Sequence, residues 1–258
     1  MDGVVLKSGT SLGRILYHIS LGNCDKIWAV TALQKDLIRY TAPFAAWIGL
    51  QSLLPATAWA YAVRTGVTAA VGMGCLFFGR SSFGVTDQTE PSRRAMTCRL
   101  LLGALLGLVV CALWILPDYS VWYRTWLCWP LGSLPPAPKS SPYDPAVCGW
   151  TLTILKLVGS AFVIAPVEEV FFRSFLYRWL QSHDFTRVDL GHFDSSAFLW
   201  MIFLFMLEHD RPVAAAMAGA AYGFAAIRWG LASAIMAHVA TNLALALHVI
   251  YWGEWAFW

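Results

Sequence analysis

Two adjacent carboxylates and an arginine interrupt a hydrophobic segment, A-P-V-E-E-V-F-F-R-S-F at 165–175. In a helix, Glu169 and Arg173 are four residues apart and share one face, so they can form an ion pair. Glu168 points about 100° away from Glu169, and its own i+4 position is Phe172, which cannot neutralise a carboxylate. Glu168 therefore has to find its partner on another helix, and a carboxylate in that position suits a general base that activates water.

A second polar pair, His238 and Asn242 in A-H-V-A-T-N, has the same i, i+4 spacing. Imidazole and amide groups both donate hydrogen bonds, and two donors on one helix face could stabilise a developing oxyanion. His209 ends the apolar run F-L-F-M-L-E-H, and it could hold a water against Glu168 or ligate a metal. Ionisable groups at membrane depth are costly and are functional candidates by default. The predicted catalytic residues are therefore Glu168, His209, His238 and Asn242.

The composition indicates that lipid surrounds the elements that carry these residues. Hydrophobic residues make up 58% of the 258, charged residues only 13%, and the mean hydropathy is +0.58. A soluble domain averages about 25% charged residues. The net charge of +3 is spread along the chain rather than clustered, so no nucleic-acid partner is expected.

The apolar segments predict an all-α fold, a polytopic transmembrane helical bundle of about seven to eight spans. An open sheet cannot cross lipid, because its edges would leave backbone groups unpaired. A break at Pro166 could divide the fourth and longest segment in two. The candidate spans are 43–63, 65–79, 100–116, 150–178, 196–208, 212–227 and 231–252.

Three regions follow from this pattern: a cytoplasmic or interfacial leader at 1–42, N-terminal transmembrane helices and loops at 43–149, and a catalytic helical core at 150–258. With the N-terminus in the cytoplasm, twelve Lys and Arg residues fall on the inside and four on the outside, as the positive-inside rule requires. The six cysteines contain no C-x-x-C pair, but Cys128 and Cys148 flank a loop and could form a disulfide in an oxidising compartment.

Three motifs occur in order in the C-terminal part of the chain: E-E-V-F-F-R at 168–173, F-M-L-E-H at 205–209 and H-V-A-T-N at 238–242. They resemble the motifs E-E-x-x-x-R, F-x-x-x-H and H-x-x-x-N of the CAAX protease and bacteriocin-processing (CPBP) family. The resemblance covers residues 150–258. The stretches L-E-H-D, A-H-V-A-T-N-L and W-G-E-W-A-F-W also look like the CAAX-related proteases associated with bacterial exosortase systems.

The resemblance implies a CAAX-type glutamic intramembrane protease. Such an enzyme cuts near the C-terminus of membrane-associated, lipidated or sorting-signal substrates. By position, Glu168 would be the base that activates water and His209 would help to bind that water. His238 and Asn242 would form the oxyanion site.

Glu169 and Arg173 would be supporting residues of the first motif. Water would be the nucleophile, so no acyl-enzyme forms and no cofactor is expected. The expected partners are membrane lipids, the C-terminal segment of a membrane-associated protein substrate and an exosortase system. The expected location is the bacterial inner membrane, with a cytoplasmic N-terminus.

Two alternatives use the same residues. Glu168, His209 and His238 could instead ligate zinc, although the sequence lacks H-E-x-x-H. The polar groups could also stabilise a non-enzymatic scaffold or immunity protein. One difficulty affects every version: if 150–178 were one straight span, Glu168 and His209 would lie at opposite ends of neighbouring spans.

Overall fold

The computed structural model describes residues 33–77, 92–120, 122 and 141–258. The chain forms two compact units, Met1–Ile38 and Arg39–Trp258, and the fold below is that of the second. Every regular element among the described residues is a helix, and none is a strand. The all-α prediction is therefore confirmed for this part of the chain. A helix satisfies its own backbone polar groups, as crossing a membrane requires.

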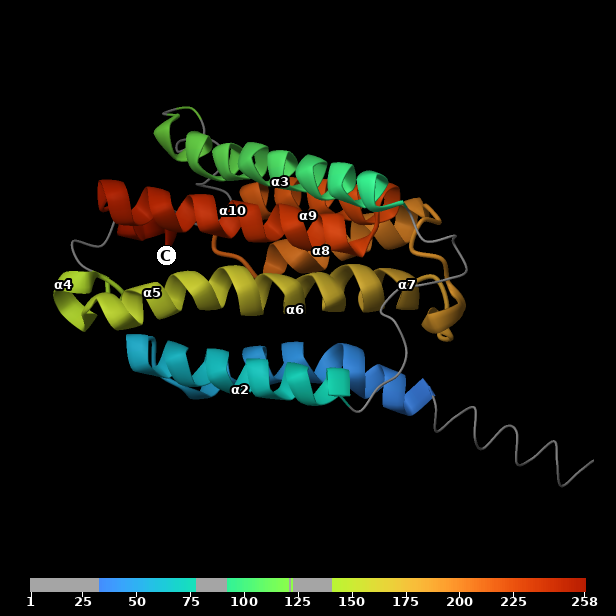
Figure 1. The fold of residues 1–258 in the computed structure, drawn as a ribbon, viewed down its shortest axis with the longest axis horizontal. Helices are drawn as coiled ribbons and strands as arrows, with labels where there is room; N and C mark the ends of the chain where they lie inside the picture. Colours follow the sequence, from blue (N-terminus) through green and yellow to red (C-terminus); the bar gives the residue numbers. More distant parts are fainter. Residues whose placement is uncertain (1–32, 78–91, 121, 123–140) are drawn as a thin grey trace, which may run out of the picture. The chain divides into compact units, whose positions relative to one another are not determined.

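Most of the elements run alongside one another. In Figure 1 the continuous helix made of α5, α6 and α7 lies between α2 and α10, and α3 packs against the other side of α10. After a helical stretch at 33–53, the elements are α2 (Ala58–Phe77), α3 (Arg93–Ile115), η1 (Leu116–Tyr119), α4 (Pro145–Cys148), α5 (Trp150–Gly159), η3 (Ser160–Ile164), α6 (Ala165–Glu169), η4 (Val170–Leu176), α7 (Tyr177–Trp179), η5 (Phe185–Arg187), α8 (Ser195–Leu207), α9 (Pro212–Trp229), α10 (Leu231–Trp252) and η6 (Trp255–Phe257).

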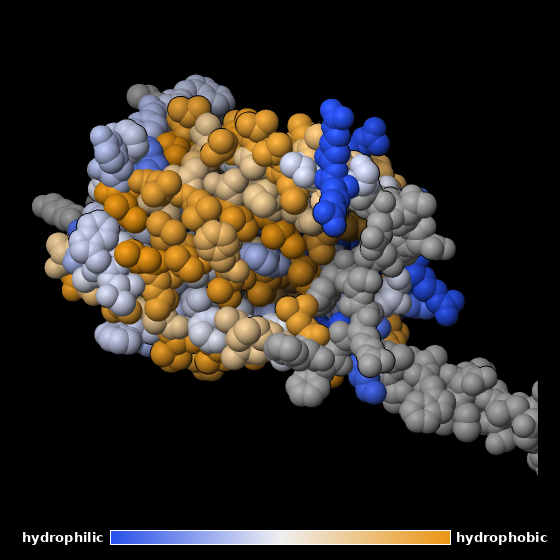
Figure 2. All heavy atoms as spheres, in the orientation of Figure 1, coloured by the Kyte–Doolittle hydropathy of each residue, from blue (hydrophilic) through white to orange (hydrophobic). Residues whose placement is uncertain are grey.

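Three helices among the described residues are long and apolar enough to cross a membrane: Arg93–Tyr119, Trp150–Trp179 and Leu231–Trp252, with 27, 30 and 22 residues. A span needs about 20 residues. Ser195–Leu207 is apolar but shorter. Figure 2 shows hydrophobic residues across the middle of one face and hydrophilic residues toward its two ends, the distribution expected of a lipid-embedded surface. The count of about seven to eight spans stays a prediction.

The N-terminal helices break at a different point from the one that hydropathy predicts. The candidate spans were 43–63 and 65–79, whereas the structure ends the first helix at residue 53 and begins the next at Ala58. Pro55 accounts for the difference, because proline lacks an N–H group and disfavours helical geometry in the residue before it. The hydroxyl of Thr57 accepts a hydrogen bond from the amide of Ala60 at 3.2 Å, which caps the new helix.

The long helix does not break at Pro166. Instead, the π-helical turn η3 immediately precedes α6, and Pro166 is the second residue of α6. A second π-helical turn, η4, carries Arg173. Such turns are rare and often lie at functional sites. They add width to the helix without ending it, so Trp150–Trp179 stays one continuous element.

Two glycines bring α3 and α10 into close contact. A Cβ atom on Gly103 would lie 2.5 Å from the carbonyl oxygen of Ser233, and one on Gly107 would lie 2.2 Å from that of Ala237. Thr241 donates a hydrogen bond from its hydroxyl to the Gly107 carbonyl at 2.8 Å. Small residues allow this approach between membrane helices. The position of α10 is thus set by the glycine face of α3.

The Gly/Ala-rich stretch 214–226 lies in α9 and packs against α8. A Cβ atom on Gly223 would lie 2.7 Å from a ring carbon of Phe198, and one on Gly219 would lie 3.2 Å from a ring carbon of Phe205. The glycines therefore leave room for the aromatic rings of α8. This packing holds the end of α8, and the histidine that follows it, against the rest of the bundle.

Candidate active site

A cavity of about 210 Å³ lies among α5, α6, α8, α9 and α10, and the three sequence motifs meet in it. All four predicted catalytic side chains, Glu168, His209, His238 and Asn242, line its wall. Glu168 comes from α6, His238 and Asn242 come from α10, and His209 follows the end of α8. Residues separated by up to 74 positions in sequence are thus brought to one cavity.

The depth problem raised by the sequence has a simple answer. Glu168 lies 11 residues before Trp179, the end of the long helix, and His209 lies 14 residues after Ser195, the start of α8. Because α8 turns back along the long helix, both distances are measured from the same end of the bundle. At 1.5 Å per residue they are about 17 Å and about 21 Å. The two side chains therefore lie at similar depth without any break at Pro166.

Glu169 is bound by two side chains, Arg173 and His238. Its Oε1 atom accepts a hydrogen bond from Arg173 at 3.0 Å and is 2.9 Å from Nδ1 of His238. The predicted pairing of Glu169 with Arg173 is present. The bond to His238 was not foreseen, because it joins α6 to α10 and no spacing within one helix predicts it. Glu169 is fully buried, so all three side chains are held rigidly.

The Glu168 carboxylate has fewer hydrogen-bond partners than that of Glu169. Its Oε2 atom is buried and has no hydrogen-bond partner among the described residues. The ring atom Nε2 of His238 lies 3.8 Å from that oxygen, beyond direct hydrogen-bond length. An unsatisfied buried acceptor in a native structure requires an explanation. Here it faces a cavity, where a water or a substrate atom could satisfy it.

The tautomer of His238 follows from its neighbours. An ionised Glu169 that is already paired with Arg173 can only accept at Nδ1, so Nδ1 carries the proton. Nε2 is then the ring atom directed toward Glu168. Tyr222 stacks on the imidazole, with ring centres 4.6 Å apart and an angle of 20° between the planes. The histidine is thus fixed in both position and rotation.

Tyr222 is a cavity residue that the sequence reasoning missed. It lines the wall and is 1% exposed. The available signal was weak: Tyr222 is the one side chain with a hydroxyl group in the stretch A-A-A-M-A-G-A-A-Y-G-F-A-A at 214–226.

His209 presents one ring nitrogen to the cavity. Its Nδ1 atom donates to the carbonyl oxygen of Phe205 at 2.8 Å, which leaves Nε2 as an acceptor. The rings of Phe205 and Trp114 pack against it at 4.5 and 5.5 Å. A neutral histidine held in this way can bind a water through Nε2.

Asn242 is already engaged with the long helix. Its amide nitrogen donates to the backbone carbonyl of Ser160 at 3.0 Å. Ser160 is the first residue of the π-helical turn η3. One of the two amide N–H groups is therefore used to dock α10, and the other is the group that could serve an oxyanion.

The C-terminal segment closes one wall of the cavity. Phe257 and Trp258 both line it. Arg211 holds this segment: it donates to the carbonyl of Ala256 at 2.9 Å and pairs with the buried carboxylate of Asp118 at 2.8 Å. The guanidinium also lies 4.3 Å from the ring of Phe257.

Glu254 provides a second attachment for the same segment. It accepts hydrogen bonds from the hydroxyl of Tyr119 and from Nε2 of His248, the latter at 2.8 Å. The hydrogen bond from Tyr119 lowers the pKa of the Glu254 carboxyl, and partial burial opposes this less strongly. An ionised Glu254 therefore joins the end of η1 to the last turn of α10.

Within the described ranges, no group of three or more His, Cys, Asp and Glu side chains is arranged to hold a metal ion. Cys148 is a free thiol, and Cys128, its predicted partner, lies outside the described residues. Neither the zinc alternative nor the disulfide has direct support in the geometry.

Part of the chain matches a known protein family. Residues 150–244 match the family model described as type II CAAX prenyl endopeptidase Rce1-like. Comparison with curated proteins and with solved structures gives no match. The matched region contains all three motifs and most of the cavity wall. It supports the CPBP family for this part of the chain, and with the apolar helices it indicates a membrane-integral peptide hydrolase of the CAAX protease class.

Proposed function

We propose that this protein is a glutamic-type intramembrane endopeptidase in which Glu168 activates water. The observation that carries the proposal is the convergence of Glu168, His209, His238 and Asn242 on one cavity. A cavity at membrane depth has no packing need for four polar side chains, whereas peptide hydrolysis needs a base, a water site and oxyanion donors.

In the proposed reaction a water molecule lies between the Glu168 carboxylate and Nε2 of His209. Glu168 takes a proton as the water oxygen attacks the scissile carbonyl carbon, and a tetrahedral oxyanion forms. When this intermediate collapses, the C–N bond breaks and the proton passes from Glu168 to the leaving amine. The products are a carboxylic acid and an amine, and no covalent enzyme intermediate occurs.

Oxyanion stabilisation would fall to His238 and Asn242. Since Nδ1 of His238 donates to Glu169, Nε2 would have to carry a second proton in order to donate to the oxyanion. Asn242 would contribute the amide N–H that Ser160 does not occupy. Glu169 and Arg173 support the site by holding His238 rather than by touching the substrate.

The finer features of the proposal rest on the resemblance of the sequence. They are cleavage near the C-terminus of lipidated or sorting-signal substrates, membership of the exosortase-associated subgroup, and insertion in a bacterial inner membrane with the N-terminus inside. About seven to eight spans belong to the same proposal, with three long apolar helices as its described part.

The decisive experiment is the Glu168→Gln variant. The full chain, reconstituted in liposomes, is incubated with membrane-anchored peptides, and the products are identified by mass spectrometry. We expect the change to lower kcat/KM by about 10²- to 10⁴-fold, the usual contribution of a general base, while the fold is retained. Asp184→Asn, the same carboxylate-to-amide change at a half-exposed residue outside the cavity, is the control.

Two results would replace this function by another. Full activity of Glu168→Gln would support a non-enzymatic scaffold or immunity role for the polar groups. Loss of wild-type cleavage after exhaustive chelation, with recovery on adding zinc, would favour the zinc mechanism using Glu168, His209 and His238. The water-activating mechanism requires that cleavage survives chelation.

A further inference from the structure

A cationic and aromatic cluster lies on the same cavity as Glu168, nearer the N-terminal end of the long helix. The ammonium nitrogen of Lys156, on α5, is 4.2 Å from the ring centre of Tyr61, 5.0 Å from Tyr143 and 5.9 Å from Trp258. Lys156, Tyr61 and Trp258 all line the cavity. Three aromatic rings thus surround one positive charge.

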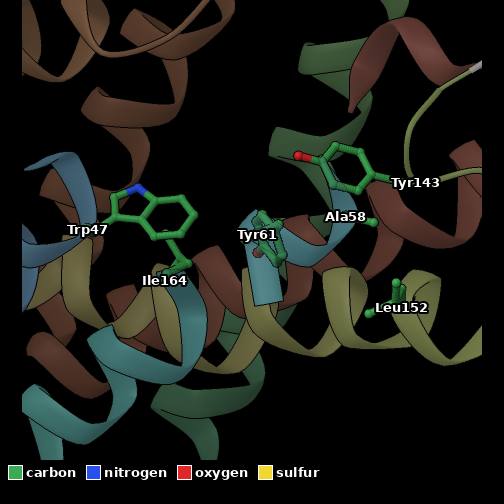
Figure 3. Packing of buried hydrophobic residues seen from close by; sticks show 6 residues of the cluster. All are labelled: Trp47, Ala58, Tyr61, Tyr143, Leu152 and Ile164. Carbon is green, nitrogen blue, oxygen red and sulfur yellow. The ribbon is translucent and has the colours of Figure 1, made fainter. Parts of the chain in front are cut away.

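Arg64 adds a second positive charge to this cluster. Its guanidinium carbon lies 4.8 Å from the ring of Trp47 and 5.5 Å from that of Tyr61. Arg64 is 7% exposed, and its Nε atom has no hydrogen-bond acceptor. In Figure 3, Tyr61 lies between Trp47 and Tyr143, so the two cations share one aromatic wall.

No carboxylate forms an ion pair with Lys156 or Arg64 among the residues that the structure describes. Cation–π contacts offset only part of the cost of removing a charge from water. Two buried cations without a paired anion therefore indicate a ligand that brings the negative charge. Because the cluster opens on the cavity of Glu168, that ligand would be the molecule that Glu168 acts on.

The spacing indicates which part of that molecule carries the charge. Lys156 precedes Glu168 by 12 residues on the same continuous helix, about 18 Å along the axis. An extended peptide spans about 3.3–3.6 Å per residue. The reach of the two side chains shortens the path, so roughly three to five residues separate the cleavage point from the anion.

We propose that Lys156, supported by Arg64, binds the free α-carboxylate at the C-terminus of the peptide substrate. This inference rests on the proposed peptidase function and gives its specificity a physical basis. Because Lys156 would hold the C-terminus of the substrate, only a bond a few substrate residues from that end would reach Glu168. Internal peptide bonds far from a C-terminus would be rejected because they leave both cations unpaired.

Binding tests the inference separately from cleavage. The probes are an N-acetylated pentapeptide of leucine and valine with a free carboxylate, the same peptide with a C-terminal carboxamide, and inorganic phosphate. Affinities are measured by thermophoresis on the full chain carrying Glu168→Gln, in detergent. We expect the carboxylate peptide to bind about ten- to a hundredfold more tightly than the carboxamide, the usual size of one charged hydrogen bond.

Variants assign this preference to the cation. Adding Lys156→Met should remove the preference for the carboxylate peptide, and adding Lys156→Arg should retain that preference. Arg187→Met, at an exposed site, should leave the preference unchanged. The inference is overturned if the unmodified site binds the two peptides equally, binds neither, or prefers phosphate. It is also overturned if folded Lys156→Met keeps the preference. Failure of the peptidase function would appear elsewhere, as wild-type cleavage that Glu168→Gln does not reduce.

Discussion

Replacing Glu169 by glutamine distinguishes a residue that positions the catalytic histidine from one that only stabilises the fold. The sequence alone predicts that losing Glu169 damages stability more than chemistry. The structure changes that expectation, because the same oxygen accepts from Arg173 at 3.0 Å and contacts Nδ1 of His238 at 2.9 Å. Both stability and catalysis should therefore suffer.

The loss of stability follows from the charges that remain. Glutamine is nearly isosteric, but it leaves the Arg173 guanidinium, 1% exposed, without its anion. Leaving one charge of a buried pair uncompensated costs about 3–5 kcal/mol. For a chain of this size, that corresponds to a melting temperature about 6–20 °C lower. The new NH₂ group adds to the cost, because the Glu169 oxygen it replaces has no hydrogen-bond partner.

The loss of activity follows from the histidine. Without an ionised Glu169, the acceptor that holds the Nδ1 proton of His238 is lost. Removing a group that orients a functional histidine typically costs about 10- to 100-fold. Glu168→Gln should show the opposite pattern, with activity lost and the melting temperature unchanged or raised, because a neutral amide costs less to bury than a carboxylate and this side chain faces the cavity.

The assay combines thermal melting in detergent with cleavage by the reconstituted protein. A Glu169→Gln variant that melts and cleaves like the wild type would refute the positioning role. The double variant Glu169→Gln with Arg173→Met is the internal check, because it removes both charges. It should recover much of the melting temperature and none of the activity.

Two further predictions concern the helices that frame the cavity. Gly107→Leu should separate α3 from α10, because even a Cβ atom would lie 2.2 Å from the Ala237 carbonyl oxygen. We expect the free energy of unfolding to fall by about 1–3 kcal/mol and cleavage to be reduced. Gly74→Leu is the control, because Gly74 has open space around it, and it should change neither quantity. Equal melting of these two variants would contradict the close packing. Because the pKa of Glu254 is lowered in the folded chain, its stabilisation is present above the ordinary value of about 4.3 and is lost as the pH falls through the lowered one. Acid melting curves should show this loss in the wild type, and Glu254→Gln should flatten them; identical curves would show that Glu254 does not hold the C-terminal segment.

Helical periodicity predicted those parts of the site that depend on one helix. The i, i+4 spacing of Glu169 and Arg173 gave their pairing, and the 100° turn between neighbours separated Glu168 from it. Ordered motifs identified the remaining site residues. To predict that these residues share one cavity, the only further assumption needed was that the helices pack as a bundle.

Contacts between different helices could not be predicted from the spacing of residues within one helix. The bond from Glu169 to His238 and the stacking of Tyr222 depend on how α6, α9 and α10 face one another. The cluster around Lys156 brings together Tyr61, 95 positions earlier in the sequence, and Trp258, 102 positions later. No spacing in the sequence indicates that Tyr61 or Arg64 would lie beside Lys156.

The orientation of α10 shows why these missing contacts matter for the chemistry. Thr241 and Asn242 are neighbours, so their side chains point about 100° apart. Thr241 binds the Gly107 carbonyl on α3, and Asn242 binds the Ser160 carbonyl in the π-helical turn of the long helix. These two bonds fix the rotation of α10, and His238, one turn earlier, is thereby directed between Glu168 and Glu169. The H-x-x-x-N motif thus carries a positioning role beside its proposed oxyanion role, and the π-helical turn supplies the carbonyl that this positioning uses.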